Sequence, residues 1–75
     1  MSLMTQAIVA ETYGLRLTMD QLAKALGIAR NTIYNRVAKG EFTVPTYLDG
    51  GQRWADYRDV AAYLDACRGR ATMQA

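Results

Sequence analysis

Histidine is absent from this sequence, and cysteine, proline, tryptophan and phenylalanine each occur once. A single cysteine excludes a disulfide within the chain, and the lack of histidine leaves no ligand set for a structural zinc ion. Histidine is also the side chain most often used for acid–base catalysis, and neither clustered carboxylates nor a nucleophile motif takes its place. The sequence therefore argues against an enzyme and predicts no metal and no other cofactor.

Long apolar runs are missing as well. No stretch approaches the length of a membrane span, and the N-terminus lacks the charged-then-apolar order of a signal peptide. We therefore expect a cytoplasmic protein with no membrane partner. The 75 residues are enough for one domain, and a domain of this size buries only about 60% of the surface that its unfolded chain exposes. Its stability is expected to be modest.

The two ends of the chain are predicted to lie outside the domain. Residues 1–3, ahead of a second methionine at Met4, are typical of an expression leader. Residues 69–75 carry no pattern and are expected to form a mobile tail. The domain is therefore predicted to cover residues 4–68.

The segment from Met4 to about Tyr13 is apolar without a clear period, and Gly14 follows it. These features favour a short helix over a strand. Its apolar side either covers the small core or pairs with a second copy of the protein, and core packing is the preferred interpretation.

Residues 18–40, TMDQLAKALGIARNTIYNRVAKG, carry the strongest pattern in the chain. Thr18 and Gln21 have the spacing of a capping box, which begins a helix by satisfying backbone N–H groups of its first turn. Leu17 before the cap and Leu22 inside the helix have the spacing of a hydrophobic staple. A helix is therefore predicted to begin directly after Thr18.

The end of this first helix is predicted at Gly27, which can adopt the left-handed conformation that stops a helix. Ile28 then points back into the core. The residues at helical spacing on the core side are Met19, Leu22, Ala23 and Leu26.

A second helix is predicted from about Ala29 to Lys39, because Ile33 and Val37 lie one turn apart and Gly40 supplies another stop. Two short helices joined by a tight turn form a helix-turn-helix. An ordinary helical hairpin in a small core is the alternative.

After Gly40 the pattern becomes extended. Pro45 excludes a helix interior over Phe42-Thr43-Val44-Pro45. A hairpin is predicted over residues 46–55, because two short strand candidates flank Asp49-Gly50-Gly51-Gln52, whose Asp-Gly and Gly-Gly pairs suit a tight turn.

A last helix is predicted from Tyr57 to about Arg68, with Asp56 as its cap. We expect it to close the core together with Trp54, and its apolar face contains Val60, Ala61, Leu64 and Cys67. Cys67 is interpreted as a small buried apolar residue rather than a reactive thiol. The fold class is thus mainly α with a small β-hairpin, in the arrangement of a winged helix-turn-helix.

The formal net charge is only +2, but the basic residues are concentrated in the helix-turn-helix. Within residues 18–40, Asp20 is the single acid, against Lys24, Arg30, Arg36 and Lys39. Residues 41–67 carry an excess of acids instead. Positive charge is therefore expected on the part that would face phosphates.

The order of these features resembles the winged helix-turn-helix of the excisionase and MerR superfamily, and in particular the AlpA-type and pyocin-activator-type prophage regulators. The likeness is carried by LAKALGIARNTIYNRVAKGEF, the hairpin YLDGGQRW and the helix DYRDVAAYLDA. AIVAETYG is similar to the short N-terminal segment of the pyocin-activator group. The resemblance implies a small phage or prophage DNA-binding protein.

The second helix, residues 29–39, is the predicted recognition helix in the major groove, with the 46–55 hairpin as the wing. Ile33 and Val37 face inward, and the N-terminal half of such a helix approaches the bases. The predicted base-facing residues are Arg30, Asn31, Tyr34 and Asn35. Arginine can pair with guanine and asparagine with adenine. Tyr34 has the alternative of a phosphate contact, and Asn35 that of a plain solvated position.

Other residues are predicted to contact the DNA backbone. Thr18 would place the N-terminus of the first helix at a phosphate, and Lys24 and Lys39 would attract phosphates without regard to sequence. Gln52 and Arg53 in the wing are expected to reach a neighbouring minor groove or backbone, and Arg53 has the alternative of a strand-edge charge that keeps the hairpin soluble.

The predicted function is a sequence-specific transcriptional regulator of phage or prophage origin. An excisionase-like recombination directionality factor, or an architectural factor that bends DNA, is the second hypothesis. A helix-turn-helix that binds another protein is the third. Because one recognition helix touches few base pairs, at least two copies are expected on the DNA, as a homodimer or a cooperative assembly.

Overall fold

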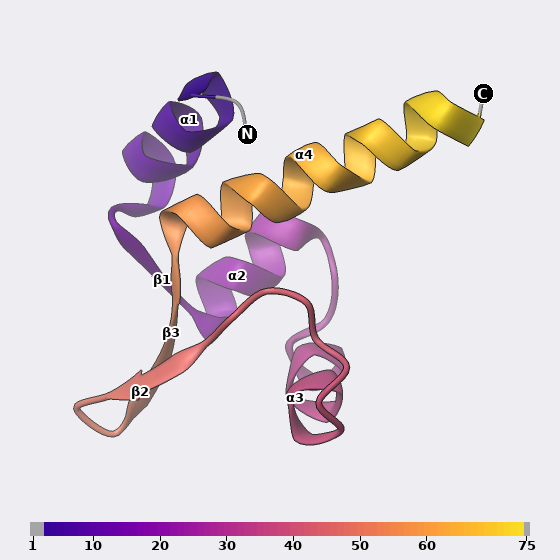
Figure 1. Cartoon of the computed structure of the whole chain (residues 1–75). Coiled ribbons are helices and arrows are strands. Elements are labelled where there is room, and N and C mark those ends of the chain that lie inside the picture. Colours follow the sequence, from indigo (N-terminus) through magenta and orange to yellow (C-terminus); the bar gives the residue numbers. More distant parts are fainter. Residues whose placement is uncertain (1–2, 75) are drawn as a thin grey trace.

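The computed structural model describes residues 3–74, which form four helices and a small three-stranded antiparallel sheet (Figure 1). In chain order the elements are α1 (Leu3–Tyr13), β1 (Arg16–Thr18), α2 (Met19–Leu26), α3 (Arg30–Ala38), β2 (Tyr47–Asp49), β3 (Gln52–Asp56) and α4 (Tyr57–Gln74). The predicted fold class is confirmed at this level: the chain is mainly helical with a small sheet. Met1, Ser2 and Ala75 lie outside the described residues, so most of the predicted leader does too, while Leu3 is the first residue of α1.

The capping box at the start of α2 is confirmed. The Gln21 backbone N–H donates to the Thr18 Oγ1 at 3.2 Å, and the Thr18 N–H donates to the Gln21 Oε1 at 3.0 Å. Leu17 and Leu22, the predicted staple, are both fully buried. The helix ends at Gly27, which has a φ of 70° and donates its N–H to the Ala23 carbonyl at 2.9 Å. A residue with a Cβ would be strained at that φ.

The second helix of the motif, α3, lies within one residue of its predicted bounds at each end. Ala29 is its N-cap and makes no side-chain capping hydrogen bond, and Lys39 is its C-cap. Ile33 is fully buried and Val37 half-buried, as their spacing predicted. Tertiary packing of Ile33 therefore holds this short helix in place of a side-chain cap.

The hairpin is confirmed, and it is joined by a strand that the sequence analysis missed. β2 and β3 pair around Gly50 and Gly51, whose φ values of 62° and 80° are those of a type I′ turn. β1 pairs with the other edge of β3, so the strand order is β1-β3-β2. Leu17 of β1 lies opposite Ala55, and both side chains are fully buried on the core face of the sheet.

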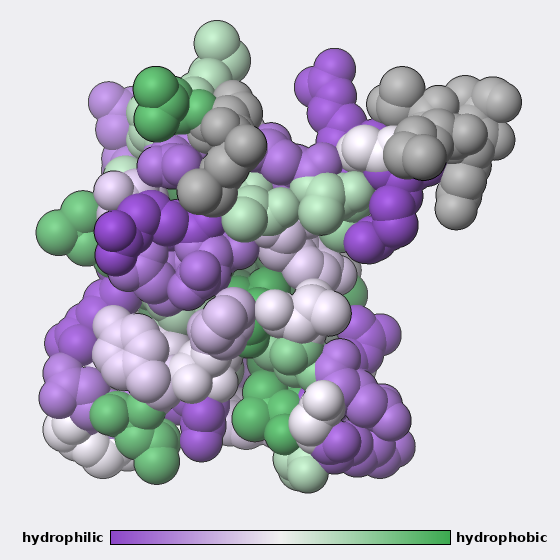
Figure 2. Space-filling view, in the orientation of Figure 1, coloured by the Kyte–Doolittle hydropathy of each residue, from purple (hydrophilic) through white to green (hydrophobic). Residues whose placement is uncertain are grey.

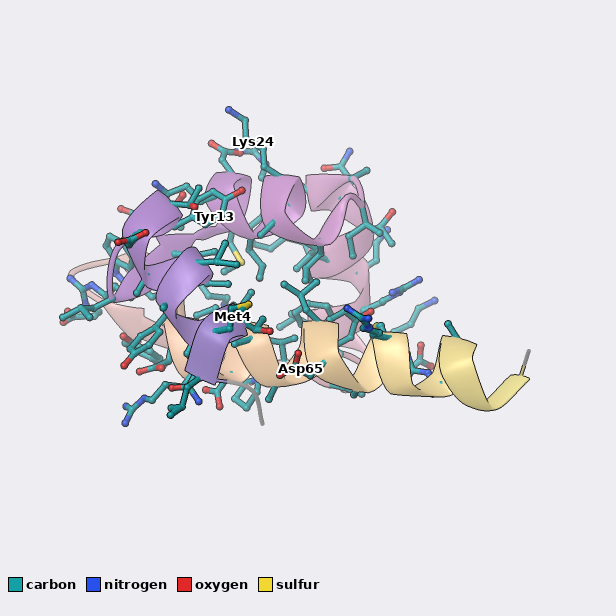
Figure 3. The ribbon with its side chains drawn as sticks, turned by 90° about the horizontal axis from the view of Figure 1, so that it is seen from above. Met4, Tyr13, Lys24 and Asp65 are labelled. Carbon is teal, nitrogen blue, oxygen red and sulfur yellow. The ribbon has the colours of Figure 1, made fainter. Side chains whose placement is uncertain are left out.

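The core lies between this face of the sheet and the helices. α1 and α4 lie against each other (Figures 1 and 3), and the Thr5 hydroxyl donates to the Asp65 carboxylate at 2.8 Å. The buried apolar residues are Val9, Leu17, Met19, Leu22, Ile33, Val44, Ala55, Val60 and Ala61. Val9 shows that α1 packs into the core, which was the preferred interpretation of that segment. Its other side remains open, because Met4 is 73% and Ile8 57% exposed.

The predicted end of the last helix is wrong. The helix was expected to stop at about Arg68, yet α4 continues through Gly69 to Gln74 and projects beyond the other elements (Figure 1). Gly69 does not adopt a positive φ and so does not stop the helix. The residues around it, such as Arg68 and Ala71, have high helix propensity.

Two side chains expected in the core lie elsewhere. Trp54 is on the outer face of the sheet, because Ala55 faces the core and successive side chains of a strand alternate. Cys67 is half-buried, and the Arg70 Nη2 donates to its sulfur at 3.2 Å. It lies nearer the projecting end of α4 than Val60 and Ala61, which reach the core.

Asp56 caps α4 as predicted, and Arg58 reinforces this cap. The Arg58 backbone N–H donates to the Asp56 Oδ1 at 2.8 Å, and the guanidinium of Arg58 contacts both carboxylate oxygens at 3.0 Å. Hydrogen bonding from Arg58 lowers the pKa of Asp56 below its ordinary value of 3.8. The carboxylate therefore stabilises the folded state in its charged form.

We expect stability to fall in acid through Asp56. A lowered folded-state pKa gives stabilisation that is fully present above pH 3.8 and is lost as the pH falls through the lower pKa of the folded protein. Asp56→Ala should cost about 0.5–2 kcal/mol at pH 7, the usual cost of losing a cap. Asp56→Asn keeps a capping acceptor, so it should cost less, and its deficit relative to the native protein should shrink as the pH falls toward the lowered pKa of Asp56. Urea unfolding at pH 7, 5 and 3 measures this, and an Asp56→Asn deficit that grows in acid would contradict it.

Candidate nucleic-acid interface

The residues predicted to face bases lie together on one exposed side of α3. Arg30, Asn31, Tyr34 and Asn35 follow the i, i+1, i+4, i+5 spacing of a single helix face, and all four are exposed. Ile33, on the opposite side, is fully buried. In the space-filling view, hydrophilic side chains lie along the outer side of the α3 region, and hydrophobic ones lie on its inner side (Figure 2). The helix is thus anchored by one side and presents donors and acceptors on the other.

Arg30 is held by an ion pair. Its Nη1 lies 2.8 Å from the Oδ1 of Asp20, a residue in the first turn of α2. Both side chains are largely exposed, at 54% and 70%. The pair therefore joins the first turn of α2 to the first turn of α3 at the surface.

The residues expected to contact phosphates differ in solvent exposure and in the hydrogen bonds that they already make. Lys24 and Lys39 are exposed, and Lys24 projects from α2 away from the rest of the protein (Figure 3). Thr18 is half-buried, and its hydroxyl already accepts the hydrogen bond of the capping box. The contribution of Thr18 to a phosphate site would therefore come from the helix N-terminus that it organises.

The two wing residues are placed differently. Gln52 is exposed and adjoins the turn, opposite Asp49. Arg53 is half-buried, lies opposite Leu48, and donates from its Nη1 to the Thr46 Oγ1 at 2.8 Å. Gln52 thus lies at the tip, whereas the guanidinium of Arg53 is held beside the start of β2.

A cluster on the outer face of the sheet was not foreseen. Arg16 of β1 reaches across β3 to β2, where its Nη1 lies 2.7 Å from the Asp49 Oδ2. On the way its guanidinium lies 3.9 Å from the centre of the Trp54 ring. The Trp54 indole N–H donates to the Asp49 carbonyl at 3.2 Å. The hydrogen bond that Arg16 donates to the Asp49 carboxylate, and secondly its interaction with the Tyr47 side chain, raise the pKa of Arg16 above its ordinary value.

This Arg16–Trp54–Asp49 cluster connects the hairpin to the α2–α3 helix pair, because β1 leads directly into the cap of α2. A cation over an aromatic ring and a charged hydrogen bond both favour one orientation of the hairpin. In the sequence, the cluster is indicated only by Arg16, the residue before Leu17. Its role can be recognised only once β1 is known to pair with β3.

Replacing Arg16 with alanine should loosen the hairpin without unfolding the domain, since the core face of the sheet is unchanged. We expect faster amide hydrogen exchange in β2 and at Trp54, and a red-shifted tryptophan emission as the ring becomes more exposed. Arg36→Ala removes another exposed arginine, outside this cluster, and is the control. Unchanged exchange in β2 would show that the cluster does not hold the hairpin.

Among residues 3–74, no group of three or more histidine, cysteine, aspartate or glutamate side chains is arranged to hold a metal ion. No helix in this range is both long and apolar enough to cross a membrane. No family model matches the chain, and no curated protein and no solved structure was found to match it. The interface must therefore be interpreted from its own residues.

Proposed function

We propose that this protein binds double-stranded DNA in a sequence-specific way and regulates transcription from a phage or prophage. The observation that carries the proposal is the exposed face of α3, where Arg30, Asn31, Tyr34 and Asn35 lie opposite the buried Ile33. The resemblance to the excisionase and MerR superfamily, noted from the sequence, supports the same function. In this proposal α3 enters the major groove and the β2–β3 hairpin is the wing.

Each residue has a defined role in the proposed complex. Arg30 donates to the two acceptors of a guanine, and Asn31 or Asn35 pairs with the acceptor and donor of an adenine. Tyr34 is 44% exposed on the same face, and its hydroxyl contacts a base edge or a phosphate. Lys24 and Lys39 attract the backbone regardless of sequence.

Two or more copies are proposed to act together on one site. A single small module buries only about 600–1,000 Å² on DNA, which gives too few base contacts for strong discrimination. The open side of α1, where Met4 and Ile8 are exposed beside Glu11, offers apolar side chains on which a second copy can pack. Inverted half-sites in the bound DNA would indicate a two-fold dimer. Direct repeats would indicate the head-to-tail assembly of an excisionase-like factor.

The proposal is tested by titrating the protein into a fluorescent duplex of mixed sequence over a range of salt concentrations. Binding should weaken steeply as salt increases, because lysine and arginine release counterions from phosphates. A Lys24→Ala, Lys39→Ala variant should bind more weakly on every sequence and show a shallower salt dependence. If the folded protein fails to bind DNA even at low salt, the proposal is wrong and the α3 surface serves a protein partner instead.

A further inference from the structure

Asp20 forms an ion pair with Arg30, and the proposed contact of Arg30 with a base does not explain why an acid lies there. Asp20 is the one acid within residues 18–40, and a carboxylate on the DNA-facing side of the motif would repel phosphates. An exposed ion pair contributes little to stability, and a carboxylate in the first turn of a helix gains a further small stabilisation from the helix dipole. Stability therefore gives only a small reason for an acid at this position, and simple attraction to DNA gives none.

We infer that Asp20 is a positioning residue that makes Arg30 selective for guanine, an inference that rests on the proposed DNA-binding function. The contact between the two residues uses the Nη1 of Arg30. The other edge of the guanidinium, formed by Nε and Nη2, still carries two parallel N–H groups. That edge matches the O6 and N7 acceptors of guanine in the major groove.

The ion pair with Asp20 also restricts the rotamers of Arg30, and with them the positions that its guanidinium can reach. An unpaired arginine on an exposed helix turn samples many rotamers and can reach any nearby phosphate, which strengthens binding to every sequence alike. Held at 2.8 Å by Asp20, the guanidinium lies at the first turn of α2, while Arg30 itself is the first residue of α3, at the end of the helix that approaches the bases in the proposed complex. Asp20 thus lowers affinity for random DNA and raises discrimination at one base pair, as repulsive elements do in other specific interfaces.

If Asp20 positions Arg30, its substitution should lower discrimination at the Arg30 base pair and raise affinity for mixed-sequence DNA. A residue that only stabilises the fold would not have these opposite effects. Asp20→Asn removes the charge and keeps the side-chain shape. We expect its discrimination at the Arg30 base pair to fall by roughly 5- to 10-fold, a part of what one bidentate contact provides. We also expect its affinity for a mixed-sequence duplex to rise severalfold, because one negative charge has been removed from the interface.

The experiment measures dissociation constants for three duplexes: the best site selected by the native protein, the same site with the Arg30-dependent base pair replaced, and a mixed sequence. The proteins are the native chain, Asp20→Asn, Arg30→Ala and the double variant, with circular dichroism to verify folding. Asp59→Asn, in the first turn of α4, makes the same charge change outside the motif and away from the open side of α1, and is the control for net charge. In the Arg30→Ala background, Asp20→Asn should change discrimination at that base pair no further.

Failure of this inference can be told apart from failure of the proposed function. If the native protein discriminates between the first two duplexes and Asp20→Asn discriminates equally well, Asp20 does not position Arg30, while DNA reading stands. The same conclusion follows if Asp20→Asn loses discrimination to the same extent with and without Arg30. If the native protein prefers no sequence, the proposed function is overturned, and the inference with it.

Discussion

Arg30→Ala is expected to weaken binding to the preferred DNA site by about 5- to 150-fold, which corresponds to the 1–3 kcal/mol of one bidentate base contact. The loss should be confined to sequences that carry the contacted guanine, since Arg30 is exposed on the outer face of α3 and contributes nothing to the core. Asn35→Ala should remove the preference at a different base pair. Competition binding with a panel of single-base variants of the site measures both effects.

Lys39→Ala is the matched control for these substitutions. Lys39 is exposed at the C-cap of α3 and is assigned to phosphate. Its loss should weaken all duplexes alike and reduce the slope of log K against log salt by about 0.9, the value for one phosphate contact. If Arg30→Ala weakens every variant duplex by the same factor, Arg30 contacts the backbone and not a base. If Asn35→Ala changes nothing, Asn35 is a solvated surface residue.

Leu22→Ala is expected to destabilise the fold more than any substitution on the exposed face of α3. Leu22 is fully buried within the same cluster as Leu17 and Ile33, and truncating a buried leucine costs about 2–5 kcal/mol. For a domain of this size each kcal/mol lowers Tm by about 4–8 °C. Because domains this small are only marginally stable, the variant should be largely unfolded at moderate temperature.

Leu48→Ala makes the same chemical change at a side chain that is 67% exposed on the hairpin. Its cost should stay within about 0.5 kcal/mol, as for ordinary surface positions. Thermal unfolding followed by circular dichroism compares the two variants directly. Equal melting temperatures would mean that Leu22 does not occupy the centre of the core.

The helix pair α2–α3 could be predicted closely because its signals are local. A capping box, a left-handed glycine and two apolar residues one turn apart act within a few residues of each other, so α2 and α3 follow from sequence spacing alone. The face of α3 followed as well, because burial of Ile33 fixes which side is exposed.

The parts that were missed depend on contacts between distant residues. β1 has only three residues and exists through its pairing with β3, some forty positions later, which no local pattern reveals. Without β1 the two faces of the hairpin could not be told apart, so Trp54 was expected to help close the core, whereas it lies on the outer face with the Arg16 guanidinium over its ring. The last helix was expected to end at about Arg68 because residues 69–75 carry no apolar pattern, yet α4 continues through Gly69 to Gln74.

The selection of bound sequences from a random pool of duplex DNA tests base reading by α3 most directly. The native protein and an Arg30→Ala, Asn35→Ala variant would be run in parallel at moderate salt, with both shown to be folded. The native protein should enrich a defined motif, and the variant should lose one or two positions of it while the rest remains. If the native protein enriches no motif, or if the variant enriches the same one unchanged, α3 does not read DNA bases.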